Sequence, residues 1–126
     1  MNRAQFNRII DDLNQYKGLQ IVLLLDSEGM VIFSSLDSTL DEDEIKTLLD
    51  AWKDRAPSLN FMNERYAILK NEEIQLAAKN IAEQKGIAGS ITNEGDYLLI
   101  QISKDTSLTL LEWSIIVNKL AWQNYS

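Results

Sequence analysis

The sequence predicts an α/β sandwich of the α+β type, in which three helices flank one central, mostly antiparallel sheet of about five strands. Two pairs of apolar runs, within 19–35 and 86–103, are each separated by a short turn that contains glycine, as in β-hairpins. Three other segments carry apolar residues at helical spacing. The expected order is helix, two strands, helix, three strands, helix, within a single domain of residues 1–126.

The first hairpin is the centre of the predicted fold. Its first strand, residues 21–25, is an unbroken apolar run, and a strand that is apolar on both faces is covered on both sides. Residues 30–33 are rich in the β-branched and aromatic side chains that strands prefer. In the turn between them, Gly29 is expected to adopt the positive φ that closes a short hairpin.

The second hairpin joins 86–92 to 97–103 through a turn at 93–96. Strand alternation places Leu98, Ile100 and Ile102 on one face of the sheet. Tyr97 and Leu99, with Gln101, share the other face, so that both faces are again expected to be covered.

The first and last helices are predicted at the two ends of the chain. Residues 3–16 carry one apolar stripe and one polar side, and Gly18 follows their end. The last helix is expected to be capped by Asp105, Thr106 or Ser107. Because its apolar residues cover more than one face, this helix either lies between the sheet and the first helix or offers a flank to a partner.

The middle helix has the clearest local signals. Thr39 with Glu42 fits a capping box, and Asp41 is an alternative cap. Acidic residues at 41–44 complement the positive end of the helix dipole, and Pro57 ends the helix. One stripe is apolar and consists of Ile45, Leu48, Leu49 and Trp52.

The stretch between the middle helix and the second hairpin is the least regular. Residues 58–64 are predicted to be a connector, and 65–70 and 74–80 to be two strands or one long bent strand. A helix over 72–84 is the alternative, because alanine and lysine favour helix and four apolar residues fit its spacing: Ile74, Ala77, Ala78 and Ile81.

Composition excludes several classes of function. The chain has no cysteine for disulfides or thiolate chemistry and no histidine, the commonest general base and metal ligand. A net charge of −7 disfavours nucleic acid as a partner. No apolar run is long enough for direct membrane insertion, and the start of the chain lacks the apolar core of a signal peptide, so a cytoplasmic protein is expected.

No motif predicts a catalytic, cofactor-binding or metal-binding residue. The acidic run 41–44 lacks the alternating ligands and glycine of a calcium loop, and is read as the start of a helix. Asp26 and Ser27 are ordinary turn residues with no base placed beside them. Gly86 and Gly89 follow Lys85, whereas a phosphate loop places its lysine after the glycines.

Self-association is the interaction that the residues themselves suggest. Trp52 closes the stripe of the middle helix, where it is either a core residue or an interface residue, since tryptophan is enriched at binding hot spots. The strand 65–70, if it lies at the edge of the sheet, offers unpaired backbone groups to a second copy.

The layout resembles the Roadblock family of dynein light chains and small-GTPase regulators. The family's first hairpin has an apolar strand, an Asp-x-x-Gly turn and a second strand ending in small polar residues, which Asp26, Gly29, Ser34 and Ser35 match. The middle helix and the strand 97–103 before the last helix also match, whereas the segment 71–85 departs from the family pattern.

This resemblance implies a non-enzymatic homodimer, or a heterodimer with a second Roadblock-like chain, that binds and regulates or scaffolds a small Ras-like GTPase. Carried over to this sequence, the dimer interface consists of Leu48, Leu49, Trp52, Tyr66 and Ile68. Profilin-like and longin-like adaptors, which have a similar layout, are the alternative. A small-molecule sensor is a further one, disfavoured because the core segments are almost wholly aliphatic.

Overall fold

The computed structural model describes residues 1–72 and 74–123. Within them, three helices and seven strands follow one another along the chain: α1 (Arg3–Leu13), β1 (Leu19–Leu25), β2 (Val31–Ser34), α2 (Glu42–Lys53), β3 (Ser58–Phe61), β4 (Glu64–Glu72), β5 (Gln75–Lys79), β6 (Gly86–Ile91), β7 (Tyr97–Ile102) and α3 (Leu110–Ala121).

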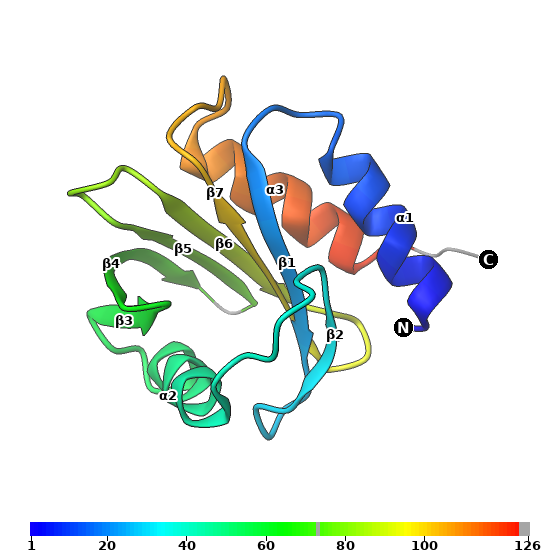
Figure 1. Cartoon of the computed structure of the whole chain (residues 1–126), viewed down its shortest axis with the longest axis horizontal. Coiled ribbons are helices and arrows are strands. Elements are labelled where there is room, and N and C mark those ends of the chain that lie inside the picture. Colours follow the sequence, from blue (N-terminus) through cyan, green and yellow to red (C-terminus); the bar gives the residue numbers. More distant parts are fainter. Residues whose placement is uncertain (73, 124–126) are drawn as a thin grey trace.

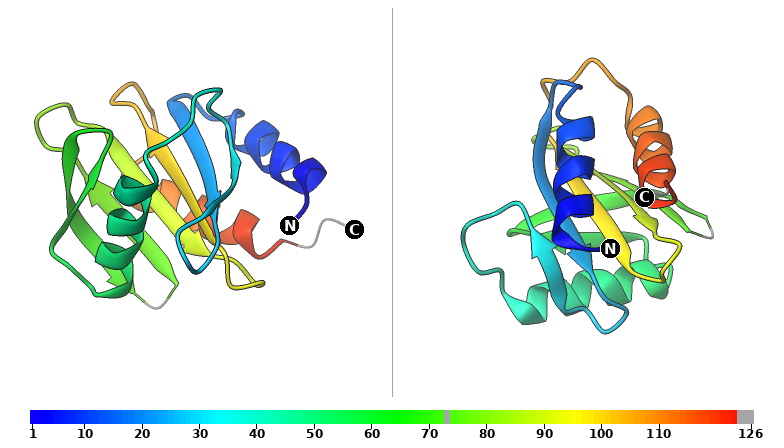
Figure 2. Two further views of the ribbon diagram at one scale, coloured as in Figure 1. Left: turned by 60° about the horizontal axis from the view of Figure 1, so that its bottom comes forward. Right: turned by 90° about the vertical axis from the view of Figure 1, so that its right-hand side faces the viewer.

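All seven strands belong to one curled sheet in the order β2-β1-β7-β6-β5-β4-β3 (Figure 1). Every neighbouring pair is antiparallel. Helices α1 and α3 pack on one face of the sheet and α2 packs on the other (Figure 2). The antiparallel sheet and three helices are as predicted, but the sheet has seven strands where about five were expected.

The two additional strands come from the stretch between α2 and the second hairpin. The predicted connector 58–64 contains β3 and the start of β4, which pair with each other. The chain then reverses, and Glu72 pairs with Gln75, so that 65–80 is a hairpin and not one long bent strand. The alternative helix over 72–84 is wrong because β5 pairs along both of its edges, and this tertiary pairing outweighs the helix propensity of its alanines.

The helix ends differ in detail from the predictions. Helix α1 ends at Leu13, and Asn2 and Gln5 form its capping box, which the sequence reading missed. The N-cap of α2 is Asp41, the alternative cap, whose side chain accepts the backbone N–H groups of two residues in the first turn. The N-cap of α3 is Thr109, which lies beyond the predicted capping residues 105–107 because it can form a capping box with Glu112.

The core has two layers, one on each face of the sheet. Strand β1 contributes to both, because Leu23 faces the layer under α2 while Val22 and Leu24 face the layer under α1 and α3. The second hairpin divides in the same way, with Leu98 and Leu99 in opposite layers. The predicted burial of both hairpins is therefore confirmed for β1, β6 and β7, whose residues 21–25, 86–90 and 97–102 are all buried. It is wrong for β2, which is exposed or only half-buried because it lies at the edge of the sheet.

Candidate functional site

The residues predicted to form a dimer interface lie mainly inside the α2 layer of the core. Leu48, Leu49, Trp52 and Tyr66 are all at most 2% exposed, and the partly buried Ile68 packs against them. The structure therefore brings these five residues together, but as core residues. With four of the side chains buried, a partner cannot reach them without opening the core.

Trp52 shows why this cluster is structural. Its ring packs edge-on against Tyr97 at 5.0 Å between centroids and lies directly over Gly89. The buried hydroxyl of Tyr66 accepts a hydrogen bond of 2.8 Å from Nε2 of Gln101. Burial raises the pKa of Tyr66, so the phenol stays protonated at neutral pH. Of the two readings left open for Trp52, the structure shows the core residue.

The outward face of α3 is a strong candidate for a contact surface. Leu111, Ile115 and Trp122 are 56%, 60% and 49% exposed, and their spacing of four and seven residues aligns them along one side of the helix. The opposite side docks on the sheet through buried residues that include Trp113 and Val117. Exposed apolar residues that form a stripe, in contrast to scattered ones, indicate an interaction site.

The stripe is held in place by its surroundings. Helix α3 packs on β5, β6 and β7, and Nε1 of Trp122 donates a hydrogen bond of 2.9 Å to the carbonyl oxygen of Ile91. Two more exposed apolar residues lie on neighbouring elements, Leu69 on β4 and Ile81 in the β5–β6 turn. The sequence signal for this surface is the wide apolar arc of the last helix. That one side of this helix contacts a partner was one of the two expectations drawn from the arc.

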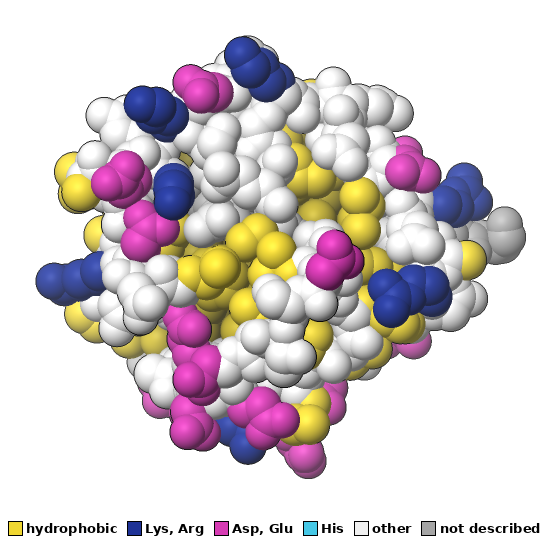
Figure 3. Space-filling model, in the orientation of Figure 1, with side chains coloured by type: hydrophobic (Ala, Val, Ile, Leu, Met, Phe, Trp, Pro, Cys, Tyr) yellow, Lys and Arg dark blue, Asp and Glu magenta, His cyan; other side chains and the backbone are white. Residues whose placement is uncertain are grey.

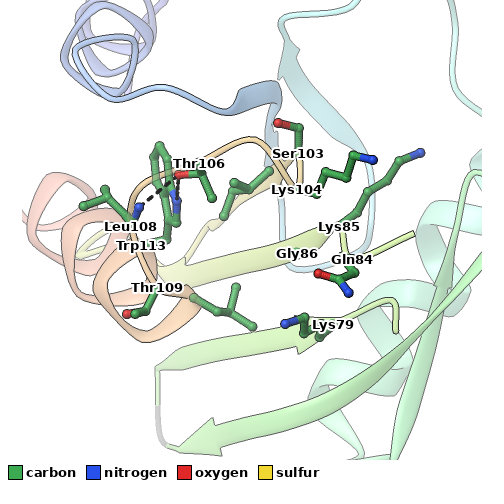
Figure 4. Close-up of a pocket in the computed structure, with 12 residues that line it drawn as sticks. Lys79, Gln84, Lys85, Gly86, Ser103, Lys104, Thr106, Leu108, Thr109 and Trp113 are labelled. Carbon is green, nitrogen blue, oxygen red and sulfur yellow. Dashed lines mark hydrogen bonds between the residues drawn. The ribbon is translucent and has the colours of Figure 1, made fainter. Parts of the chain in front are cut away.

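A pocket of about 290 Å³ lies at the N-terminal end of α3, between the β5–β6 turn and the loop from β7 (Figure 4). Lys79, Lys85 and Lys104 line it, and Trp113 forms part of its wall, with Nε1 donating a 3.0 Å hydrogen bond to Oγ1 of Thr106. In the close-up the ammonium group of Lys79 points away from those of the other two lysines. The three cations therefore do not converge on one ligand.

One of these lysines is already paired. Lys85 Nζ lies 2.8 Å from Oε1 of Glu64, and this hydrogen bond raises the pKa of Lys85. The arrangement as a whole offers apolar contact area along α3 and positive charge at one end of it. Among residues 1–72 and 74–123, no three His, Cys, Asp or Glu side chains gather as a metal ion would require. No helix in that part of the chain is long and apolar enough to cross a membrane.

A curled antiparallel sheet, covered by its two end helices on one face and carrying an exposed apolar stripe on α3, defines a small protein-interaction module. Over 123 residues, the chain is 50% identical to Loki profilin-3 of Lokiarchaeum sp. (strain GC14_75), a match that covers 97% of this chain and 99% of the relative. The chain therefore belongs to the profilin family. A scan against protein-family models finds no match.

Solved structures agree with this fold. LokiProfilin2, in its complex with rabbit actin, superposes with a TM-score of 0.79 at 15% identity, covering 96% of this chain and 95% of that one. LokiProfilin1, also in a complex with rabbit actin, gives 0.78 at 17% identity, with coverages of 96% and 93%. Profilin IA of Acanthamoeba castellanii gives 0.66 at 16% identity, covering 82% of each chain.

The Roadblock resemblance is thus wrong, and the membership of the profilin family overturns it. With it go the predicted Ras-like GTPase partner and the pairing with itself or a Roadblock-like chain. The residues that match the Roadblock pattern stabilise a β-turn, and unrelated hairpins use the same residue types for this purpose. Oδ1 of Asp26 accepts 2.9 Å hydrogen bonds from two backbone N–H groups of its own turn, and Gly29 has the expected positive φ of 87°. Of the named alternatives, the profilin-like domain is the one that the comparison supports.

Proposed function

We propose that this chain is a non-enzymatic actin-binding protein, and that the outward face of α3, with the adjoining parts of β4 and the β5–β6 turn, contacts actin. Two lines of support are the chain's membership of the profilin family and the two structural neighbours whose structures are complexes with rabbit actin. The observation that carries the proposal is the exposed stripe of Leu111, Ile115 and Trp122. The cytoplasmic location expected from the composition is part of this proposal.

The stripe has the physical properties of a binding hot spot. Its residues project from a helix whose other side is locked into the core, so docking a partner requires little ordering of the surface. The indole of Trp122 is oriented by its hydrogen bond to Ile91, which removes part of the entropy cost of immobilising a large side chain. Aromatic and aliphatic anchors of this kind carry most of the binding free energy at interfaces.

The lysines at the start of α3 add a charge pattern to this surface. The chain has a net charge of −7, yet Lys79 and Lys104 flank the same pocket without an ion-pair partner among the described residues. Local positive charge at the margin of an interface raises the association rate of a partner with acidic side chains and makes that rate dependent on salt. The proposal therefore expects a partner surface that presents carboxylates opposite this end of α3.

The test is the affinity for monomeric rabbit actin, measured by isothermal titration with the full chain. Ile115→Ser removes the most exposed apolar side chain of the stripe, and we expect it to weaken binding about tenfold or more. Met30→Ser is the matched control, because it removes an exposed apolar side chain on the other side of the molecule and should leave the affinity unchanged. Circular dichroism checks that both variants stay folded.

Two outcomes contradict the proposal. If the unmodified chain shows no saturable binding to actin, the function itself is wrong for this partner. If the unmodified chain binds actin and the Ile115→Ser variant has the same affinity, actin binds elsewhere and the α3 surface is wrongly assigned.

A further inference from the structure

A second exposed apolar surface, at the edge of the sheet formed by β2, lies away from the α3 stripe. Strand β2 is at one end of the sheet and pairs only with β1 among the described strands, so its outer edge has no strand partner. Three consecutive apolar residues at its start, Met30, Val31 and Ile32, are 46%, 39% and 38% exposed. An open edge with exposed apolar side chains is a place where an extended segment can add as a further strand.

A groove accompanies this edge. About 180 Å³ of open volume lies between β2 and the first turn of α2, lined mainly by apolar groups that include Met30, Val31, Leu40 and Ile45. Ser38 and Thr39, in the loop from β2 to α2, line its other side. Figure 2 (left) shows the course of this loop. The volume is enough for one or two aliphatic side chains of a strand lying along β2.

The rim of the groove is strongly acidic. Glu42 lines the groove, and Asp37, Asp41 and Asp43 are exposed and adjoin its lining residues along the chain. Figure 3 shows Asp and Glu side chains gathering around α2 and the β1–β2 turn. Asp41 is engaged as the helix cap, but no ion pair neutralises the other three among the described residues. Like charges at a shared edge repel, so this rim disfavours a second copy of the same acidic chain.

We infer that the groove between β2 and the start of α2 binds an extended peptide segment in which every second side chain faces the groove, and in which these groove-facing side chains are in turn apolar and lysine or arginine. The backbone of the peptide adds to the free edge of β2, and its apolar side chains enter the groove beside Met30 and Leu40. The basic side chains lie over the carboxylates of Asp37 and Glu42. This site lies on the face of the sheet opposite to α3, so its occupation does not require release of a partner from the α3 stripe.

The probe is a synthetic peptide of repeated Val-Thr-Lys-Thr, about ten residues long, which exceeds the length of a typical edge strand and places valine and lysine in turn on one face. It is titrated into the isotope-labelled full chain and followed by amide chemical shifts. We expect saturable changes in residues 30–34 and in the first turn of α2, and none in α3. The same peptide with N-methyl groups on consecutive backbone nitrogens keeps its charge but has no N–H groups on either edge to pair as a strand, and should not bind.

Two matched pairs of variants sharpen the test. Asp37→Asn with Glu42→Gln removes two charges from the rim, and we expect about tenfold weaker binding of the peptide. Glu83→Gln with Asp105→Asn removes the same charge from the β5–β6 turn and the loop before α3, away from β2, and should change nothing. Met30→Ser should weaken binding of the peptide, whereas Ile115→Ser should weaken only binding of actin.

The inference is overturned if no saturable shift occurs up to about millimolar peptide. It is also overturned if the N-methylated peptide binds equally well, which would mean non-specific attraction between charges. Shifts confined to α3 would place the peptide on the other surface and contradict the inference as well. Because actin binding is measured separately, each of these results leaves the proposed function untouched.

Discussion

Helices α2 and α3 have the same length of 12 residues, and each is capped at its N-terminus, but they use their apolar residues differently. Helix α2 buries its whole apolar stripe against one face of the sheet and presents charged residues to solvent. Helix α3 buries one apolar side against the other face and leaves a second one exposed. A helix that carries more apolar surface than its own packing requires thus points to a partner.

The largest expected effect separates two tryptophans, one at the C-terminal end of each helix. Trp52→Ala should lower the free energy of unfolding by about 3–5 kcal/mol, because it leaves a large cavity between Tyr97 and Gly89. Trp122→Ala should cost only about 1 kcal/mol, since half of the indole is already exposed and one hydrogen bond is lost. Urea denaturation of both variants measures the difference, and equal losses would show that the two helices are not distinct in this way.

The next effect concerns two glycines on β6, one under each helix. A Cβ added to Gly89 would lie 2.7 Å from Cη2 of Trp52, a ring fixed inside the core. Gly89→Ala should therefore destabilise the fold by about 1–3 kcal/mol. A Cβ at Gly86 would lie 2.9 Å from Cδ1 of Leu110, the end of a flexible and partly exposed side chain that can rotate away.

Gly86→Ala is the matched control, and we expect it to change the free energy of unfolding by no more than about 0.5 kcal/mol. Thermal unfolding of the two alanine variants gives the comparison directly. A larger loss for Gly86→Ala would mean that α3 is held as rigidly as α2.

The parts of the fold that the sequence predicts are those decided by local chemistry. The Asp26–Gly29 turn, the doubly apolar β1 and the stripe of α2 each follow from patterns within a few residues. Strands β3 to β5 depend on pairing between segments, and Ala77 and Ala78 carry no periodicity that excludes a helix. The number of strands could therefore not be read from this stretch alone.

The candidate site illustrates the same limit. Trp52 and Ile115 are both apolar residues on amphipathic helices, and only the position of the sheet decides which of them is buried. The sequence shows that α3 has apolar residues over a wide arc, but not which part of the arc the sheet covers. The small polar residues at the end of β2 were read as a family signature, although the hydroxyl oxygens of Ser34 and Ser35 accept hydrogen bonds from the backbone N–H groups of Leu36 and Val22.

A smaller effect is expected at the two helix caps. Asp41→Ala removes the acceptor for the N–H groups of Asp43 and Glu44, and Thr109→Ala removes the capping box with Glu112. Each should cost about 1 kcal/mol of unfolding free energy in urea titrations. Similar losses of unfolding free energy would show that the helices differ in how their faces pack and not in how their ends are capped. A negligible loss for Thr109→Ala would instead show that the start of α3 is held by packing alone.

The smallest effect on stability is expected for the residue that matters most for the proposed function. Ile115→Ser should change the free energy of unfolding by no more than about 0.5 kcal/mol, because the side chain has few neighbours to lose. Leu48→Ser, at the buried stripe of α2, should cost more than about 2 kcal/mol, since it opens a cavity and buries a hydroxyl. If Ile115→Ser destabilised the chain as much as Leu48→Ser, the exposed stripe would be structural, and weaker actin binding by that variant would no longer identify a contact surface.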